Sequence, residues 1–598
     1  MDLLPRVYKT EGDIVEFSPS KILNSIVKET NMNEDDAKNI TELVVRRIIS
    51  SGMKFLSGPH IREIVCSILS ENHFEQERKL YTRIGMPLMD YEEILEKGIS
   101  NGEDQTLNPE KIHHWAANQL AEEYTLLRIL SDEESKAHLF GDLHIHQLKY
   151  FDLRPYNQYY DPRLVLEHGI PPIKKYDQIC QSNPPKDLKE VVDQLASWLG
   201  IVQTEFSGNQ GLEFLTIFLA PYCSGMKKEA IKSIMKNFLF KINYLIAASG
   251  KNMLNTSISC TPMILPQFRD IPAIGPMGKI LGTYSNYGKE CEILFTVISE
   301  IFKEGDACGK VFPTPEHLVL FNHEWLQSYQ EQFDPLISEA YLTHNPSFIN
   351  IEKNRRVSSQ IEQYRSDSYF NFGVLQKISI NLPRYAYMGQ DETNLMDLLN
   401  EKLKVCFDIL RKKNNIIKQR LETKHLPLCS GGINDKQLFN LQNQQLCIGV
   451  VGLNEAVKII CDAELHESES AFHLGKSILS NIAEQCEEQT KIEKINYSLI
   501  DSSSNRAIQR FIRLDAKHFP KFALKEYQQS THFSALANLD IKKRIRMQGT
   551  FHEIILNEPK MKISINKNKE FIKNETDLRE ILFYASENSN LNRIKFVK

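Results

Sequence analysis

Residues 372–387 read FGVLQKISINLPRYAY, and the run KISINLP within them has the apolar character of a short buried strand. A second run of the same kind, LCIGVVGL, occupies 446–453. Strands with little polar interruption are typical of sheets that helices cover on both faces. Helical stretches such as DLKEVVDQLASWLG at 187–200 alternate with these strands, and this alternation favours an α/β fold. We therefore predict one large α/β domain, with a closed or open core of strands, over residues 112–556.

Composition and charge limit the class of protein. Of 598 residues, 41% are hydrophobic and 25% are charged, which is ordinary for a folded globular chain. A formal net charge of -5 gives no broad positive field, so we expect no extended nucleic-acid binding. No apolar run reaches the roughly 18 residues of a membrane span, and the N-terminus lacks a signal-peptide pattern. We expect no membrane association and a cytoplasmic location.

Cysteine and histidine spacing gives no sign of a metal site. The eleven cysteines are scattered, and no two form a Cys-x-x-Cys pair. This pattern indicates neither a disulfide framework nor a thiolate zinc site. His144 and His146 would face the same way on a strand. Because no third ligand is visible near them, we interpret both as core or surface histidines.

The N-terminal part reads as a separate small domain over residues 1–95. An extended stretch, VYKTEGDIVEF, precedes three helical stretches at 21–30, 34–50 and 57–71. A polar linker rich in Gly, Asn and charge follows at 96–111, before the large domain. We treat residues 557–598, rich in Lys, Asn and Glu, as a C-terminal segment after that domain.

Lysines near the turn at residues 9–12 suggest phosphate binding only together with the rest of the N-terminal pattern. Lys9 and Lys21 could place two ammonium groups near one pocket, where they would suit triphosphate oxygens, although such lysines are more often a solvated face. With Phe17, Tyr81 and Arg83, the pattern resembles the ATP-cone, a small regulatory nucleotide-binding module. The turn Lys-Thr-Glu-Gly departs from the usual Lys-Arg-Asp-Gly and lacks a bidentate phosphate partner. The resemblance implies ATP or dATP as effector and these nucleotide-binding residues: Val7, Lys9, Thr10, Gly12, Lys21, Ser57 and Arg62.

Several stretches of the large domain resemble the anaerobic (class III) ribonucleotide reductases, a branch of the glycyl-radical enzymes. INLPR, within the opening stretch, and VGLNEA, which follows it, are the most specific. The similar stretches, in family order, are 141–170, 200–222, 310–322, 372–387, 448–457 and 530–552. The resemblance implies a ten-stranded α/β barrel, ribonucleoside-triphosphate reduction and a homodimer.

The family's chemistry depends on thiols that this chain lacks at the matching positions. A thiyl radical on a finger loop removes a ribose hydrogen, and a second cysteine supports the reduction. The counterpart of the finger-loop Cys-Arg is Tyr364-Arg365, and no cysteine lies between Cys308 and Cys406. The counterpart of the supporting cysteine is Asn157. We interpret Tyr364 as a packing residue, because a phenoxyl radical is too weak to abstract a ribose hydrogen.

The family's zinc cysteines and glycyl-radical loop also have no counterpart in the sequence as it stands. The last glycine is Gly549 and the last cysteine is Cys486. We therefore expect no zinc site and no glycyl radical. As residues of a surviving barrel pocket we name Gln203, Thr204, Arg365 and Asn381.

Three hypotheses follow. The first is a nucleotide-binding relative of the reductase that lacks radical-based reduction and has a regulatory role as a pseudoenzyme in deoxyribonucleotide metabolism. The second is an active reductase subunit whose glycyl-radical part is supplied by another chain. The third is a non-catalytic scaffold or assembly partner, in complex with a complete reductase. We rank the first above the second, because a second chain cannot restore thiols at Asn157 and Tyr364.

Overall fold

The computed structural model describes the chain in two compact units, residues 1–135 and 136–598. It does not describe residues 1–5, 9–13, 31, 53–54, 83–87, 98, 101–104, 107–108, 171–179, 249–252, 355–368, 370, 434–435, 502–503, 535–536, 538, 556–558, 567–571 and 598. The first unit includes α6 (Pro109–Tyr124) and so extends beyond the linker expected at 96–111.

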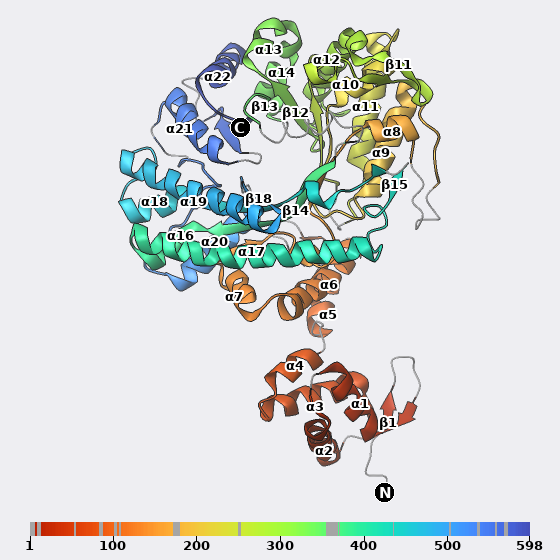
Figure 1. The fold of residues 1–598 in the computed structure, drawn as a ribbon, viewed down its shortest axis with the longest axis vertical. Coiled ribbons are helices and arrows are strands. Elements are labelled where there is room, and N and C mark those ends of the chain that lie inside the picture. Colours follow the sequence, from red (N-terminus) through yellow and green to blue (C-terminus); the bar gives the residue numbers. More distant parts are fainter. Residues whose placement is uncertain are drawn as a thin grey trace. The chain divides into compact units, whose positions relative to one another are not determined.

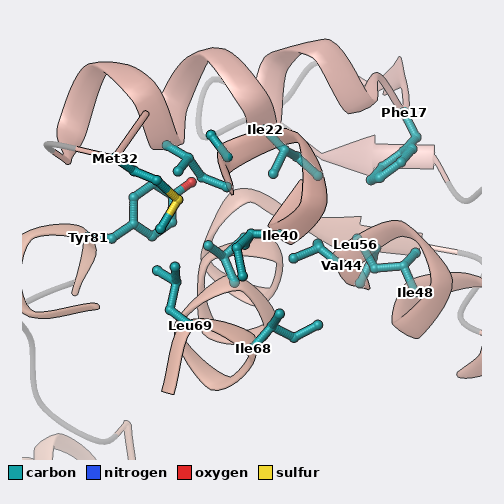
Figure 2. Packing of buried hydrophobic residues seen from close by; sticks show 13 residues of the cluster. Phe17, Ile22, Met32, Ile40, Val44, Ile48, Leu56, Ile68, Leu69 and Tyr81 are labelled. Carbon is teal, nitrogen blue, oxygen red and sulfur yellow. The ribbon is translucent and has the colours of Figure 1, made fainter. Parts of the chain in front are cut away.

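The first unit joins a small sheet to a group of helices. The central strand β1 (Arg6–Tyr8) pairs antiparallel with β2 (Ile14–Glu16) and parallel with β3 (Phe55–Ser57). The next elements are α1 (Pro19–Glu29), α2 (Glu34–Ser50), α3 (Gly58–Glu71), α4 (Glu75–Tyr81), α5 (Leu88–Lys97), β4 (Ile99–Ser100) and β5 (Gln105–Thr106). Figure 2 shows side chains such as Ile22, Ile40 and Ile68 converging in one apolar core. The three helices expected from the sequence are confirmed, and the described parts of the expected extended stretch form β1 and β2.

Helix starts in this unit follow local chemistry. Pro19 occupies the first turn of α1, where the missing N–H is not needed for a helical hydrogen bond. Asn33 caps α2, because its side chain accepts a hydrogen bond from the backbone N–H of Asp36 at 2.9 Å. The acidic residues Glu34 and Asp35 in the first turn of α2 also favour the positive end of the helix dipole.

The second unit is built on one large sheet that forms the α/β barrel. Among the described residues, ten strands follow one another in the order β18-β17-β14-β7-β8-β9-β12-β13-β20-β19, and the short β6 (Leu143–Ile145) pairs with β14 beside this path. The strands are β7 (Asn157–Tyr160), β8 (Gln210–Leu212), β9 (Thr256–Cys260), β12 (Glu316–Phe321), β13 (Ser347–Asn350), β14 (Asn371–Asn381), β17 (Gln444–Val451), β18 (Asn496–Ile500), β19 (Lys560–Ser564) and β20 (Arg593–Val597).

Pairing directions divide the barrel into two halves. Strands β7, β8, β9, β12 and β13 are parallel to one another. Strand β14 runs antiparallel to β7, and β20 runs antiparallel to β13. Since β14, β17 and β18 are parallel, and β19 is parallel to β20, the second half also runs in a single direction. The strands β19 and β20 complete this second half, so the barrel continues to Val597 and takes in the segment expected to follow it.

Helices lie on the outside of the strands, as Figure 1 shows for the long α17. The helices after the first half-barrel strands are α8 (Arg163–His168), α9 (Leu188–Val202), α10 (Leu215–Leu219), α11 (Lys228–Tyr244), α12 (Gly288–Glu304), α13 (His323–Ser328) and α14 (Gln330–Thr343). Those of the second half are α16 (Leu382–Gly389), α17 (Glu392–Glu422), α18 (Leu453–Cys461), α19 (Glu469–Glu493), α20 (Asn505–His518), α21 (Ile541–Ile554) and α22 (Glu575–Asn588). In the described part of the chain, no helix is both long and apolar enough to cross a membrane.

The INLPR motif marks a change from strand to helix. All eleven residues of β14 are buried, as expected for a strand that side chains cover on both faces. The strand ends at Asn381, and Pro383 lies in the first turn of α16. Arg384 then forms ion pairs with Asp142 at 2.7 Å and with Asp515 at 2.8 Å. The motif therefore ties β14 and α16 to α20 through a buried charge cluster.

Candidate functional site

The barrel encloses a cavity of about 450 Å³. Its walls come from both half-barrels, from Tyr156 and Asn157 at the start of β7 to Lys595 on β20. The ionisable lining comprises four cations and two carboxylates: Lys377, Lys560, Arg593, Lys595, Glu316 and Asp501. This volume is in the range of small-molecule sites.

Glu316 is the centre of a charge cluster on one wall. Its Oε1 lies 2.6 Å from Nη2 of Arg593, 3.3 Å from Nζ of Lys595 and 3.6 Å from Nζ of Lys560. The Ser347 hydroxyl also donates to this oxygen at 3.0 Å. Burial opposes ionisation of Glu316, yet the neighbouring cations hold the pKa of its carboxyl well below the ordinary value. One carboxylate is thus shared by three cations.

Lys560 is a largely buried cation of this wall whose pKa is lowered. Burial, with the charge of Arg593 close by, lowers the pKa of its ammonium to about 8. Glu316 acts in the opposite direction, since a neighbouring carboxylate favours the charged amine. The amine of Lys560 is therefore an ammonium that loses its proton more easily than a surface lysine.

Asp501 joins this wall to the strand β14. Its backbone carbonyl accepts a hydrogen bond from Nζ of Lys377 at 3.0 Å, and its Oδ2 accepts one from the backbone N–H of Lys560 at 3.0 Å. Asp501 follows β18 directly and Lys560 begins β19. The two edge strands of the described sheet are therefore held together beside the cavity.

Asn157, the counterpart of the supporting cysteine, lines the cavity. Its Oδ1 accepts a hydrogen bond from the backbone N–H of Asn209 at 2.8 Å. A Cβ added at Gly208 would lie 2.0 Å from the same oxygen, so glycine is required for this close approach. No cysteine is among the described residues that line the cavity. Tyr364 and Arg365 lie outside the described residues, in the segment that connects β13 to β14.

The other residues named for a barrel pocket lie elsewhere. Gln203 bonds to the loop after α11, donating to the carbonyl of Ile246 at 3.0 Å and accepting from Ala248 N at 2.8 Å. Thr204 donates to the carbonyl of Ile201. Asn381 donates to the carbonyl of Gly141 and to Oδ2 of Asp515. The structure thus uses these three polar side chains to fasten loops and helix ends, and they do not belong to the described lining of the cavity.

A second cavity, of about 200 Å³, lies in the first unit. It brings together three of the residues named for nucleotide binding: Val7, Lys21 and Arg62. Lys9, Thr10 and Gly12 lie outside the described residues. Ser57 ends β3 directly before Gly58, which lines the cavity, and the structure does not describe its side chain.

Arg62 is held in place from three directions. Its guanidinium forms an ion pair with Glu29 at 2.6 Å and donates to the carbonyl of Tyr81 at 2.8 Å. It also lies over the ring of Tyr81, with its central carbon 4.3 Å from the ring centroid. The hydrogen bond to Glu29 raises the pKa of Arg62, and the same bond lowers the pKa of Glu29. Lys21, at the start of α1, is exposed at the mouth of this cavity.

The histidines of the DLHIH stretch form a buried cluster with a third one. The rings of His138 and His144 are 5.5 Å apart, and those of His144 and His146 are 4.8 Å apart. Burial lowers the pKa of all three, to about 3 for His144. Within the described residues, no group of three or more His, Cys, Asp or Glu side chains could hold a metal ion. Of the two alternatives expected for His144 and His146, core or surface, the structure shows buried core residues.

The sequence alone did not predict the charge cluster around Glu316 on the wall of the barrel cavity. Glu316, Lys560, Arg593 and Lys595 are far apart in the chain, and each lies in a different local context. One signal was present: Lys560 and Lys562, like Arg593 and Lys595, alternate with apolar residues along their strands. Such alternation predicts that the charged side chains share one face of each strand. It does not predict that this face lines the interior of the barrel.

Comparison with known proteins gives a consistent result. The family model described as anaerobic ribonucleoside-triphosphate reductase matches residues 101–585, and the ATP cone domain model matches residues 5–83. The anaerobic ribonucleoside-triphosphate reductase of Salmonella typhimurium is 20% identical over 619 aligned positions, which cover 91% of this chain and 82% of that protein. The protein of the same description from Haemophilus influenzae is 22% identical over 190 residues, covering 30% of this chain and 26% of that protein.

A solved structure gives the same fold. The anaerobic ribonucleotide reductase from Thermotoga maritima, in complex with dATP and CTP, is 17% identical, with a TM-score of 0.68. The match covers 82% of this chain and 84% of that chain. The expected ten-stranded α/β barrel is therefore confirmed.

Proposed function

This chain belongs to the anaerobic ribonucleoside-triphosphate reductase family, and we propose that it binds ATP or dATP without carrying out radical reduction of ribonucleotides itself. The observation that carries the proposal is Asn157 in the wall of the barrel cavity, where the family resemblance calls for a thiol. A nucleotide-binding protein with the fold of the reductase and without its radical chemistry is a regulatory pseudoenzyme.

Nucleotide binding is supported by the first unit. This unit matches the ATP cone domain, and its cavity combines apolar and cationic side chains. Val7, Ile22 and Ile61 offer an apolar wall of the kind that an adenine ring packs against. Lys21 and Arg62 offer positive charge for phosphate oxygens, with Arg62 already oriented by Glu29. The solved Thermotoga maritima relative is a complex with dATP and CTP, which supports naming dATP beside ATP.

The proposal that the chain carries out no radical chemistry is based on the lack of thiols at the matching positions. Removal of a ribose hydrogen requires an S–H bond similar in strength to the ribose C–H bond. The sequence contains no cysteine between Cys308 and Cys406, the stretch that includes the connection from β13 to β14. Tyr364 cannot substitute, because a phenoxyl radical is too weak an abstractor. The described lining of the barrel cavity also offers no thiol.

A regulatory role would follow if the protein binds nucleotides without reducing them. As a pseudoenzyme, the protein would act in deoxyribonucleotide metabolism through a homodimer or through a complex with a complete reductase. An active subunit with a separately supplied glycyl radical would still need a thiol near Asn157 and Tyr364. A pure scaffold would keep the barrel and show no nucleotide affinity.

Calorimetry separates these roles. We would titrate the full chain with ATP, dATP and the four ribonucleoside triphosphates. The proposal expects ATP or dATP to bind below the millimolar range. No binding of any nucleotide in that range would contradict it and favour the scaffold. Formation of a deoxyribonucleotide under anaerobic activation would contradict the second half of the proposal.

A further inference from the structure

We propose that the exposed face of α20 is a docking surface for an acidic segment of another protein, held by Arg506, Arg513 and Lys517. Neither cavity includes these residues, so the inference does not depend on nucleotide binding or on the loss of radical chemistry. It goes beyond the proposed function because it names the chemistry by which the outer surface of the barrel would recognise a protein partner.

The cations of α20 lie on one face of the helix. Their positions are separated by four, three and four residues, the spacing at which side chains share one helical face. We call them the cationic stripe: Arg506, Arg510, Arg513 and Lys517. The side chains that α20 buries lie on the other face: Ala507, Ile508, Phe511 and Asp515. Asp515 is paired with Arg384 at 2.8 Å and faces away from the stripe.

The protein itself does not neutralise this stripe. Arg506, Arg513 and Lys517 are exposed, and none of them forms an ion pair within the part of the chain that the structure describes. By contrast, Lys232 on α11 lies 2.9 Å from Glu300 and 2.6 Å from Glu304 on the neighbouring α12. Like charges four residues apart weaken a helix. The stripe therefore lowers the stability of α20, and local structure gives no compensation.

The helix dipole accounts for only one of the exposed cations. Lys517 lies in the last turn of α20, where positive charge is favourable. Arg506 lies in the first turn, which contains no acidic residue and where the dipole disfavours a cation. Arg513 is too far from either end to be stabilised in this way. Carboxylates of a partner would offset the charge of both arginines.

The remaining cation of the stripe fastens another helix beside α20. Arg510 donates a hydrogen bond to the backbone carbonyl of His138, near the end of α7 (Asp132–Phe140). The ring of Phe140 then lies 6.1 Å from the ring of His518, between centroids. The end of α7 therefore forms one edge of the surface that carries the stripe.

Exposed apolar side chains flank the cations. Leu139 and Phe140 at the end of α7 are 51% and 52% exposed, and Phe522, on the turn after α20, is 71% exposed. Arginine and aromatic residues are enriched in protein interfaces and among the residues that dominate binding energy. A guanidinium also binds a carboxylate through two parallel hydrogen bonds. A segment that combines Glu or Asp with apolar residues would match both features.

Nucleic acid fits the same surface less well. The chain has a formal net charge of -5, so its positive potential is local. The stripe is about 17 Å long at roughly 1.5 Å per residue, and it can reach only a few phosphates. Binding through phosphate contacts alone weakens steeply with salt. The aliphatic side chain of Leu139 offers no ring on which a base could stack.

The test measures binding of fluorescent synthetic peptides to the full chain by anisotropy, without nucleotide. The acidic peptide is a helix of about five turns with glutamates at the spacing of the stripe and phenylalanines beside them. A control peptide has lysine in place of every glutamate. We expect the acidic peptide to bind and the lysine peptide not to bind. No binding of the acidic peptide at millimolar concentration would overturn the proposal.

A single-stranded oligothymidylate of similar length tests the other class of polyanion. We expect it to bind more weakly than the acidic peptide. Tighter binding of the oligothymidylate would identify nucleic acid as the occupant and would overturn the proposal.

Charge reversal locates the surface. The double variant Arg513→Glu and Lys517→Glu should weaken the acidic peptide by about tenfold or more, because like charges would then face each other. Lys418→Glu with Lys476→Glu, at exposed positions of α17 and α19, is the matched control and should have little effect. Equal affinities for the two double variants would overturn the proposal. All four positions are exposed, so the fold does not depend on them.

Two more measurements separate this surface from simple attraction between charges and from the nucleotide site. Phe522→Ser should weaken the acidic peptide several-fold, whereas Ile492→Ser, at an exposed position of α19, should not. Equal affinities for these variants would mean that charge alone attracts the peptide and would overturn the docking surface. Calorimetry with ATP should give the wild-type affinity for the Arg513→Glu and Lys517→Glu variant, so the two proposals can fail separately.

Discussion

The backbone N–H of Lys560 donates a hydrogen bond to Oδ2 of Asp501 at 3.0 Å. This bond links the start of β19 to the end of β18, the two edge strands of the described sheet. The same aspartate accepts a hydrogen bond from Lys377 through its backbone carbonyl. Asp501 therefore contacts both the edge strand β19 and the cavity residue Lys377.

Asp501→Ala should lower the melting temperature of the protein. The substitution leaves the partly buried N–H of Lys560 without its acceptor, a loss of about 1 kcal/mol. Scanning calorimetry measures the effect, and Asp270→Ala, at an exposed position, is the control. Equal melting temperatures for the two variants would show that the Asp501 side chain does not hold the two edges together.

Lys413→Met should also destabilise the barrel. The Lys413 ammonium is buried, and it donates to the carbonyls of Tyr150, Phe151 and Arg154 at 3.1, 2.7 and 2.6 Å. Burial lowers the pKa of Lys413 to about 7. Methionine keeps most of the volume and removes every donor, so we expect a loss of about 1–3 kcal/mol or more.

The matched control for this change lies on the same helix. Lys418→Met, at an exposed position of α17, should leave the melting temperature unchanged. Thermal unfolding followed by circular dichroism measures both variants. If the Lys413→Met protein were as stable as the Lys418→Met protein, the three hydrogen bonds of Lys413 to backbone carbonyls would not stabilise the barrel.

The histidine cluster predicts a loss of stability in acid. Burial lowers the pKa of His144 to about 3 from its ordinary value of 6.5. Below pH 6.5 the unfolded chain takes up a proton that the folded protein refuses, so stability falls as the pH drops from 6.5 toward 3. His144→Gln cannot bind that proton and should show a shallower fall.

Melting temperatures measured between pH 7 and pH 4, as the difference between variant and wild type, isolate this effect from that of other titrating groups. His473→Gln, at an exposed position of α19, is the control and should follow the wild type. A His144→Gln protein with the same acid slope as the wild type would contradict the prediction.

Lys21→Ala should weaken ATP binding in the first unit. Lys21 is exposed at the mouth of the cavity that Val7 and Arg62 also line. Removal of one charge-assisted contact to a phosphate should reduce affinity by about tenfold. Lys28→Ala, at an exposed position of the same helix, is the matched control. Calorimetry with ATP that gave equal affinities for the two variants would remove Lys21 from the site.

The fold was accessible from the sequence because it depends on local patterns. The buried run of β14, with Pro383 directly after it, indicated a strand covered on both faces, and the structure confirms this. The resemblance to the ATP-cone, rather than local pattern alone, grouped Val7, Lys21 and Arg62. The cavity that they line is found in the structure.

The barrel site was less accessible, because it is assembled from distant strands. Glu316 and Arg593 are in contact only because β20 pairs with β13 beside β12. No local pattern around either residue specifies that pairing. Gln203 and Asn381, which were named for a barrel pocket, bond to nearby backbone and are not in the described lining of the cavity. Their hydrogen bonds depend on loops whose course the sequence does not indicate.

The most direct test of the pseudoenzyme account is an anaerobic turnover assay. The full chain would be incubated with an activating enzyme, a supplied glycyl-radical fragment, a reductant and each ribonucleoside triphosphate, with a complete reductase of the same class as positive control. The account predicts no deoxyribonucleotide above background while the control turns over, because Asn157 and Tyr364 offer no thiol. Deoxyribonucleotide formation that requires this chain would contradict it.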